Sequence, residues 1–172
     1  VAENGPLDEP PRETPRVRSF DDAVALSRKS DFVALWRGGA PPAAAAVAGR
    51  ELPARLLPLG ALWASSWAIT NLLFAPGRAW LGKGFGEDGR SGYNVFEGGR
   101  RCRAFRASVQ PSRLDGRPAL VLDYGPDALW GGVAGMRDEL REVAPGVLLG
   151  LGSMRLTGGA QNCAPFVLDA SD

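Results

Sequence analysis

The run WLGKGFGEDGRSGYNVF, residues 80–96, opens a stretch that continues to Asp169 as short runs of leucine, β-branched and aromatic residues. Glycine, proline and aspartate separate these runs, as in GEDG at 86–89 and LDGR at 114–117. Short apolar runs joined by such turn residues are typical of β-hairpins. Because the connections are too short for crossover helices, the strands are expected to be antiparallel. The stretch therefore predicts a closed or half-closed antiparallel sheet.

This β-domain is expected to span residues 80–169 and to contain about seven strands. Turn residues set the boundaries between the strands. The predicted strands are Trp80–Phe85, Tyr93–Glu97, Arg101–Val109, Pro118–Tyr124, Glu139–Val143, Val147–Leu156 and Cys163–Asp169.

The chain before the β-domain is predicted to be mainly helical, so the whole protein is expected to be mainly β with N-terminal helices (α+β). Residues 1–18 contain four prolines among mixed charges and are expected to form an extended arm. Ser19, followed closely by two aspartates, is typical of a helix N-cap. Helices are predicted near residues 20–28, 31–37 and 56–74, within a helical segment that spans residues 19–76.

The segment from Leu56 to Pro76 contains no charged residue, and about 20 apolar residues can cross a bilayer. Its prolines, glycine and polar residues lower its hydropathy, so the favoured interpretation is a helix largely covered by the sheet. A single-pass membrane anchor is the alternative. Trp63 and Trp67, four residues apart, would lie on one face of that helix.

The chain has 20 basic and 19 acidic residues, a formal net charge of +1, and no histidine. The near-neutral charge does not favour binding to nucleic acid or to an acidic membrane. Without histidine, the usual agent of acid–base catalysis near neutral pH is missing, and a serine or cysteine nucleophile lacks its usual base. No histidine or cysteine cluster has metal-ligand spacing. The composition therefore favours a binding protein without a metal over an enzyme.

Lys83 is one of only two lysines and lies in an otherwise apolar predicted strand. Lysine is most often exposed, and a solvated Lys83 is the favoured interpretation. If Lys83 instead faces the interior of a barrel, its pKa would fall, and its amine could hold a carboxylate or a carbonyl group. Asp123 and Tyr124 form another polar pair at the end of a predicted strand.

A dense charged patch runs from Arg137 to Glu142. Strand alternation places Glu139 and Arg141 on one face, with Asp138 and Glu142 on the other. Opposite charges on neighbouring strands explain the patch most simply. Carboxylates that converge in a pocket would instead point to acid–base chemistry.

Four arginines cluster between Arg100 and Arg106. Strand alternation would place Arg101 and Arg103 on one face and Arg106 on the other. Charges of this kind are typical of a solvated edge strand, because they discourage edge-to-edge aggregation.

The chain has two cysteines, Cys102 and Cys163, in two different predicted strands. They could pair if these strands are neighbours. The favoured interpretation is that both are small buried hydrophobic residues.

Several short motifs resemble a family of small proteins named for a Gly-x-Trp-x-Gly motif near the N-terminus, which is followed by a C-terminal domain of unknown function. The resemblance implies a calycin-like or lipocalin-like barrel and no catalytic residue. The first glycine of the motif is Ala34 in this chain. The motifs that carry the resemblance are Trp36-Arg37-Gly38, Trp80–Phe85, Asp138–Val143 leading to Leu148-Leu149-Gly150, and Pro165–Leu168.

The sequence predicts a non-enzymatic binding protein or accessory subunit, which holds an apolar molecule such as a lipid, isoprenoid or pigment. Docking on the subunits of a membrane protein complex, through the arm and the 56–76 helix, is the other form of this hypothesis. The residues expected to bind a ligand or partner are aromatic, apart from one lysine: Trp36, Trp63, Trp67, Phe74, Trp80, Lys83, Phe85 and Tyr124.

An enzyme is the alternative hypothesis. It would be an isomerase or hydrolase that acts on a hydrophobic small molecule, with Asp123, Glu139 or Lys83 inside the cavity. The chain begins at Val1 without methionine and is rich in alanine, glycine and arginine. A processed organellar protein, such as a plastid one, is therefore expected in preference to a cytoplasmic one.

Overall fold

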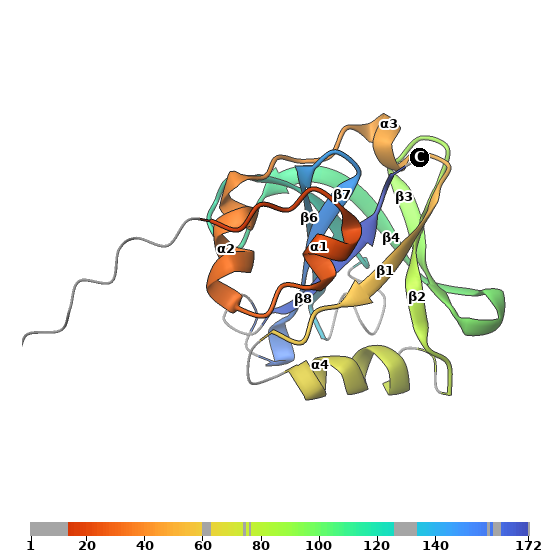
Figure 1. Ribbon diagram of the computed structural model, residues 1–172. Coiled ribbons are helices and arrows are strands. Elements are labelled where there is room, and N and C mark those ends of the chain that lie inside the picture. Colours follow the sequence, from red (N-terminus) through yellow and green to blue (C-terminus); the bar gives the residue numbers. More distant parts are fainter. Residues whose placement is uncertain are drawn as a thin grey trace, which may run out of the picture.

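A computed structural model describes residues 14–59, 63–73, 75, 77–125, 134–157, 159 and 163–171. Within these ranges eight strands pair in sequence order and close into an antiparallel barrel, because β1 pairs with both β2 and β8 (Figure 1). The strands are β1 Glu51–Leu56, β2 Trp80–Phe85, β3 Ser91–Phe96, β4 Arg100–Pro111, β5 Pro118–Asp123, β6 Met136–Ala144, β7 Val147–Met154 and β8 Ala164–Asp169.

The prediction of a mainly antiparallel β-protein with short N-terminal helices is confirmed, and the sheet is a closed barrel of eight strands rather than seven. The seven predicted strands correspond to β2–β8, with ends shifted by a few residues. The eighth strand, β1, lies inside the segment that was predicted to be helical. Its Leu52 and Ala54 are buried, whereas Pro53 is exposed and lies opposite Gly82.

The predicted helix over residues 56–74 is wrong at its start, because Leu56 is the last residue of β1. The helical part is α4, Trp63–Ala68, which continues directly into a π-helical turn, Ile69–Leu73. Among the described residues, no helix has the length and apolar character needed to cross a membrane. Residue 74 lies outside the described residues, as does the side chain of Trp63.

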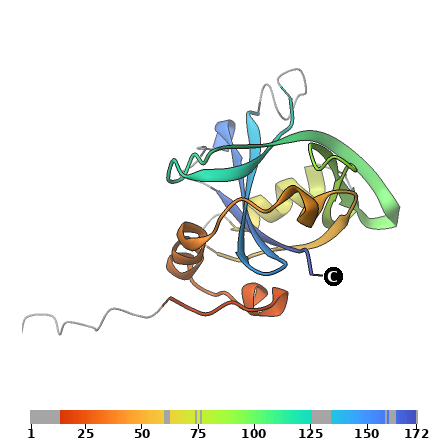
Figure 2. The same ribbon diagram turned by 90° about the horizontal axis from the view of Figure 1, so that it is seen from above.

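Two short helices cover one outer side of the barrel, α1 (Phe20–Val24) and α2 (Lys29–Gly38) (Figure 2). A capping box starts α1: the Asp22 amide donates to Ser19 Oγ at 3.2 Å, and the Ser19 amide donates to Asp22 Oδ2 at 3.1 Å. The predicted helix at 20–28 is therefore real but shorter. Most of the predicted arm, residues 1–13, lies outside the described residues.

Two hydrophobic cores lie on the two sides of the barrel wall. The interior core contains side chains from all eight strands, among them Phe96, Phe105 and Phe166. The outer core forms where α1 and α2 pack on β5, β7 and β8, and includes Trp36 and Leu149. The first five residues of β7 are buried without alternation, because this strand contacts both cores.

The two ends of the barrel differ, and we name them by their helices. The α3 end carries α3 (Ala44–Val47), on a segment that crosses the opening of the barrel between α2 and β1 (Figure 2). Paired backbone bonds between Ala40 and Glu142 hold this segment on β6. The α4 end lies beneath, where Ile69 and Ala75 pack against the interior core (Figure 1).

The arginine-rich strand β4 is not an edge strand, because it pairs with β3 and β5. The alternation also fails there: Arg103 has a φ of 59°, and the β3–β4 register shifts between Gly92 and Asn94. This irregularity adds one residue to the strand, so Arg101 and Arg106 are both exposed. The prediction that they lie on opposite faces is wrong.

Both cysteines are free thiols. Cys102 lies on β4, and Cys163 immediately precedes β8, a strand that does not neighbour β4 in the barrel. Each side chain is partly buried against one of the two cores, as predicted for small hydrophobic residues.

Candidate functional site

Lys83 lies inside the barrel. Its side chain is 2% exposed, so the prediction of a solvated lysine is wrong. Strand β2 turns Trp80, Lys83 and Phe85 inward, with a register shift between Trp80 and Gly82 that accounts for the uneven spacing. The charged end of Lys83 therefore lies in the most apolar part of the molecule, where it needs partners.

Three acceptors satisfy the three protons of the Lys83 ammonium. Nζ donates to Asp138 Oδ2 at 2.6 Å, to Asn94 Oδ1 at 2.8 Å and to the Tyr124 hydroxyl at 2.9 Å. The Tyr124 hydroxyl donates to Asp138 Oδ2 at 2.6 Å, and Trp80 Nε1 donates to Asn94 Oδ1 at 3.1 Å. Lys83, Asn94 and Asp138 come from β2, β3 and β6, and Tyr124 directly follows β5, so the network links strands that are not all neighbours in the barrel wall.

Aromatic rings surround the same ammonium group. Nζ of Lys83 lies 5.4–5.6 Å from the ring centres of Trp80, Phe105, Tyr124 and Phe166. These distances are within the range in which a cation is attracted to the face of a ring. The barrel thus holds its own cation in an aromatic cage.

The network shifts two pKa values. Burial lowers the pKa of the Lys83 amine, and the adjacent Asp138 carboxylate opposes that shift. Burial also raises the pKa of Tyr124 well above its ordinary value, and the charge of Asp138 acts in the same direction. The phenol therefore stays protonated and remains a donor to Asp138 at neutral pH.

Three of the predicted site residues, Trp80, Lys83 and Tyr124, meet in this cluster, and a fourth, Phe85, packs on the Phe105 ring that faces it, with ring centres 5.4 Å apart. Asn94 was not among the predicted site residues, and Asp138 was predicted to pair with opposite charges on neighbouring strands. The alternation of side chains along a strand could have indicated Asn94. It lies two residues from both Gly92 and Phe96, so it shares the inner face of the strand with Phe96. Each of the four polar side chains, Lys83, Asn94, Tyr124 and Asp138, bonds to at least two of the others, so among the described residues they form a self-contained network.

Two other candidates for acid–base chemistry do not enter the barrel. Asp123 is exposed. Glu139 is buried but lies on the outer side of β6, where it pairs with Arg137 Nε at 3.1 Å and accepts from the Arg113 amide at 2.9 Å. The hypothesis that these carboxylates line the cavity is therefore wrong. Within the described ranges, no group of three histidine, cysteine or acidic side chains is placed to hold a metal ion.

Trp36 belongs to a second buried network, outside the barrel. Its ring lies 4.8 Å from the guanidinium carbon of Arg141, a fully buried side chain on β6. Two Arg141 nitrogens donate to the two carboxylate oxygens of Asp115, each at 2.7 Å. Its other three donors bind the carbonyls of Trp36, Arg117 and Pro118 at 2.9–3.0 Å. Arg141 therefore fixes α2 and the β4–β5 turn to the barrel wall.

The Asp115 pair makes stability depend on pH. The hydrogen bonds from Arg141 lower the pKa of Asp115, so the folded protein binds this proton less readily than the unfolded chain. A lowered folded pKa stabilises the protein above the unfolded value of about 4, and the stabilisation is lost as pH falls through the folded pKa. The free energy of unfolding of the wild type should therefore exceed that of Asp115→Asn near neutral pH, and the difference should vanish in acid. Urea denaturation at several pH values measures this difference. A difference that does not change with pH would contradict a lowered pKa of Asp115.

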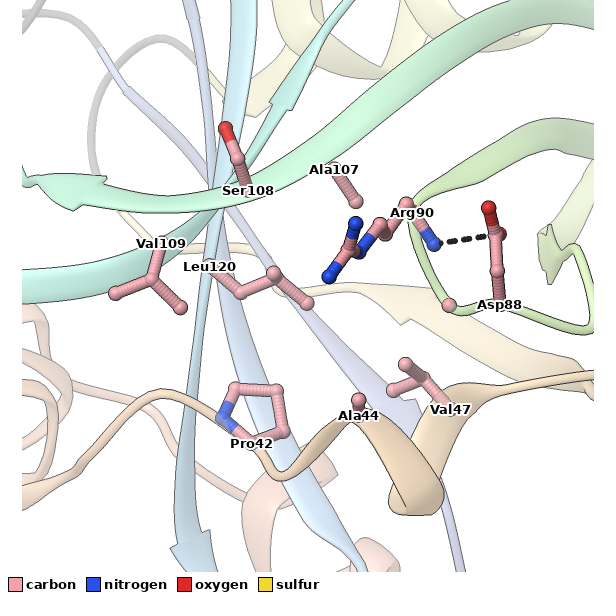
Figure 3. A pocket seen from close by; sticks show the side chains of 10 residues that line it. Pro42, Ala44, Val47, Asp88, Arg90, Ala107, Ser108, Val109 and Leu120 are labelled. Atoms are coloured by element: carbon pink, nitrogen blue, oxygen red, sulfur yellow. Dashed lines mark hydrogen bonds between the residues drawn. The ribbon is translucent and has the colours of Figure 1, made fainter.

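A pocket of about 430 Å³ opens at the α3 end (Figure 3). The α3 segment, the β2–β3 turn, β4 and β5 enclose it. Its apolar lining includes Val47, Ala107 and Leu120, which also belong to the interior core. The lining residues are Pro42, Ala44, Val47, Asp88, Gly89, Arg90, Ala107, Ser108, Val109 and Leu120.

Arg90 supplies the positive charge of this pocket. Figure 3 shows its guanidinium group pointing into the space between Ala107 and Leu120. Its backbone amide donates to Asp88 Oδ1 at 2.9 Å, which orders the turn. Within the part of the chain that the structure describes, the Arg90 side chain has no hydrogen-bond or ion-pair partner. The pocket therefore combines an apolar wall with an available cation.

The remaining predicted aromatic residue, Trp67, is 43% exposed on α4, at the opposite end from the pocket. None of the predicted site residues lines the pocket. Arg90 could not be predicted as a site residue, because it lies in a turn, GEDGRS, whose composition indicates only a hairpin.

No protein-family model matches the chain, and no significant match was found among the curated proteins or the solved structures.

Proposed function

We propose that the protein is a non-enzymatic, lipocalin-like binding protein that holds a small amphiphile at the α3 end of its barrel. The ligand has an apolar body, of the lipid or isoprenoid type, and an anionic head such as a carboxylate. The observation that carries this proposal is the pocket in which Arg90, without a side-chain partner among the described residues, points toward an apolar wall.

The pocket has the size and the chemistry for such a ligand. Its volume of about 430 Å³ lies within the ordinary range of small-molecule sites, about 300–1,000 Å³. Val47, Ala107 and Leu120 offer apolar contact, and the guanidinium group of Arg90 matches the geometry of a carboxylate. The exposed Ser108 adds a hydroxyl group to the lining. The ligand would thus bury its apolar part against the barrel and pair its charge with Arg90.

The pocket is a better candidate than the centre of the barrel. The aromatic rings that could bind a cationic ligand already surround the ammonium group of Lys83. The ammonium group, which could bind an anionic ligand, already pairs with Asp138. A ligand there would have to break a buried ion pair with short hydrogen bonds, which is costly.

An enzyme is the second candidate, and one observation favours it. Lys83, Tyr124 and Asp138 are in mutual contact, and two of them have shifted pKa values, a pattern found at catalytic sites. Each of the three side chains is almost fully buried. An isomerase or hydrolase would therefore need the interior to open before a hydrophobic substrate could reach these groups.

Decanoate, below its micellar concentration, tests the binding proposal. We expect Arg90→Gln to weaken decanoate binding by about tenfold, because a hydrogen bond to a charged group contributes roughly 1.5–3 kcal/mol. Decanol, which has no charge, should bind the wild type and the variant equally. Isothermal titration calorimetry measures both affinities.

Arg106→Gln is the matched control, because Arg106 is an exposed arginine of β4 that does not line the pocket. It should leave decanoate binding unchanged. Equal losses in both arginine variants, or no binding by the wild type, would contradict the proposal. Turnover of a hydrophobic ester that is abolished by Lys83→Met in a folded variant would favour the enzyme instead.

A further inference from the structure

The α4 end of the barrel exposes large apolar side chains. On the helical segment that closes this end, Trp67 is 43% exposed and Leu72 is 51% exposed. Leu156, 67% exposed, follows β7 at the same end. Leu81, 41% exposed, lies one residue after β2 begins there. Of the large hydrophobic residues exposed in the described ranges, only Val109 lies at the other end, near the end of β4.

Arginines surround this apolar surface. The α4 end carries Arg55 near the end of β1, Arg78 before β2, Arg100 at the start of β4 and Arg155 after β7, all exposed. The acidic side chains that the structure describes at this end are those of Glu97 and Asp123. Asp123 lies in register between Arg106 and Arg137, so arginines flank its charge on both sides. Among the described residues the charge at this end is therefore positive, although the chain as a whole is nearly neutral.

The centre of this surface carries no charge. No acidic or basic residue occurs between Arg55 and Arg78, although α4 and the π-helical turn lie on the outside of the barrel. A helix on the surface of a globular protein normally has charged or polar residues on its outer face. Here Ala64 and Trp67 are exposed on α4, and Leu72 is exposed on the turn that follows.

We propose that the α4 end binds the surface of an anionic lipid bilayer. Trp67 and Leu72 would enter the boundary between headgroups and acyl chains, where tryptophan is enriched and where interfacial helices bury their apolar face. The arginines around them would lie at the level of the lipid phosphates, which attract basic residues. The uncharged apolar centre would thus face the acyl chains, and the basic rim would face the anionic headgroups above them.

Membrane binding through the α4 end is independent of the proposed ligand pocket. The pocket lies at the α3 end, on the opposite side of the barrel, so a protein bound through α4 would keep the pocket open to water. Failure of decanoate binding and failure of membrane binding can therefore be observed separately.

Sedimentation with phosphatidylcholine vesicles, with and without phosphatidylglycerol, tests the inference. We expect the wild type to bind the vesicles that contain phosphatidylglycerol, and binding to weaken at high salt. The double variant Trp67→Ser/Leu72→Ser should lower the partition coefficient by about tenfold or more, because both side chains lose apolar burial. Arg78→Gln/Arg100→Gln should weaken binding to the anionic vesicles only.

Val109→Ser is the matched control, because it removes an apolar side chain that is at least as exposed as Trp67 and Leu72 from the other end of the barrel. It should leave the partition coefficient unchanged, and circular dichroism should show that all variants are folded. Absence of binding to either kind of vesicle would overturn the proposal. So would binding only to native membranes that is lost after protease treatment, since the partner would then be a membrane protein.

Discussion

Replacing Lys83 by methionine is expected to lower the free energy of unfolding by about 3–5 kcal/mol, the usual cost of removing one partner of a buried ion pair. Methionine has a similar length, so the loss comes mainly from Asp138, whose charge would stay buried without its cation. Asn94 and Tyr124 would each lose one hydrogen bond as well. Urea denaturation followed by circular dichroism measures the change.

Two further variants separate the ion pair from simple loss of packing. The double variant Lys83→Met/Asp138→Asn removes both charges. It should be more stable than Lys83→Met alone, although it carries a second substitution. Arg101→Met breaks a pair with Glu51 at 2.8 Å, against 2.6 Å for Lys83 and Asp138, but this pair is solvent-exposed, so its loss should cost less than about 1 kcal/mol. A double variant less stable than Lys83→Met would show that the charges do not determine the effect.

The second large effect is expected at Arg141, where lysine should cost about 2–4 kcal/mol although it keeps the charge. The guanidinium group uses all five donors and stacks on Trp36, whereas an ammonium group has three donors and no flat face. At least two acceptors would therefore lose their donors. Urea denaturation gives the size of the loss.

The same variant should also loosen α2 selectively. Arg141 binds the carbonyl of Trp36 near the end of this helix, so amide hydrogen exchange should accelerate over residues 32–38 before it does so in the strands. Arg106→Lys, at an exposed position, is expected to change stability by no more than about 0.5 kcal/mol. Unchanged exchange in α2 would contradict the proposed role of Arg141 as the link between helix and barrel.

Much of the barrel could be predicted because its signals are local. Glycine-rich turns and apolar runs predicted the approximate positions of β2–β8, and the short connections indicated antiparallel pairing. Strand β1 was not predicted, because Pro53 interrupts a short apolar run. Proline is tolerated in a strand at a position where no backbone N–H has to donate to the neighbouring strand. The uncharged segment that starts at Leu56 was predicted to be one long helix, but Leu56 is the last residue of β1, and the described helical residues are those of α4 and the π-helical turn.

The candidate site was harder to predict, because its partners lie far apart in the sequence. Lys83 and Asp138 are 55 residues apart, and nothing around either residue shows that they meet. The alternation in β6 was predicted correctly, with Asp138 and Glu139 on opposite faces. Whether a face points into the barrel or outward depends on the closure of the sheet, so the alternation could not show which of the two carboxylates would meet Lys83.

The sequence by itself determined the class of the protein: an antiparallel β-domain after short helices, with no histidine for acid–base chemistry and only two cysteines. Only the tertiary structure decided that eight strands close into a barrel, that Lys83 is caged inside it, and that the pocket and the basic apolar surface lie at opposite ends. The physical reason is that turn and strand signals act between neighbours in the chain. Burial, ion pairing and surface charge depend instead on which distant residues the closed barrel brings together.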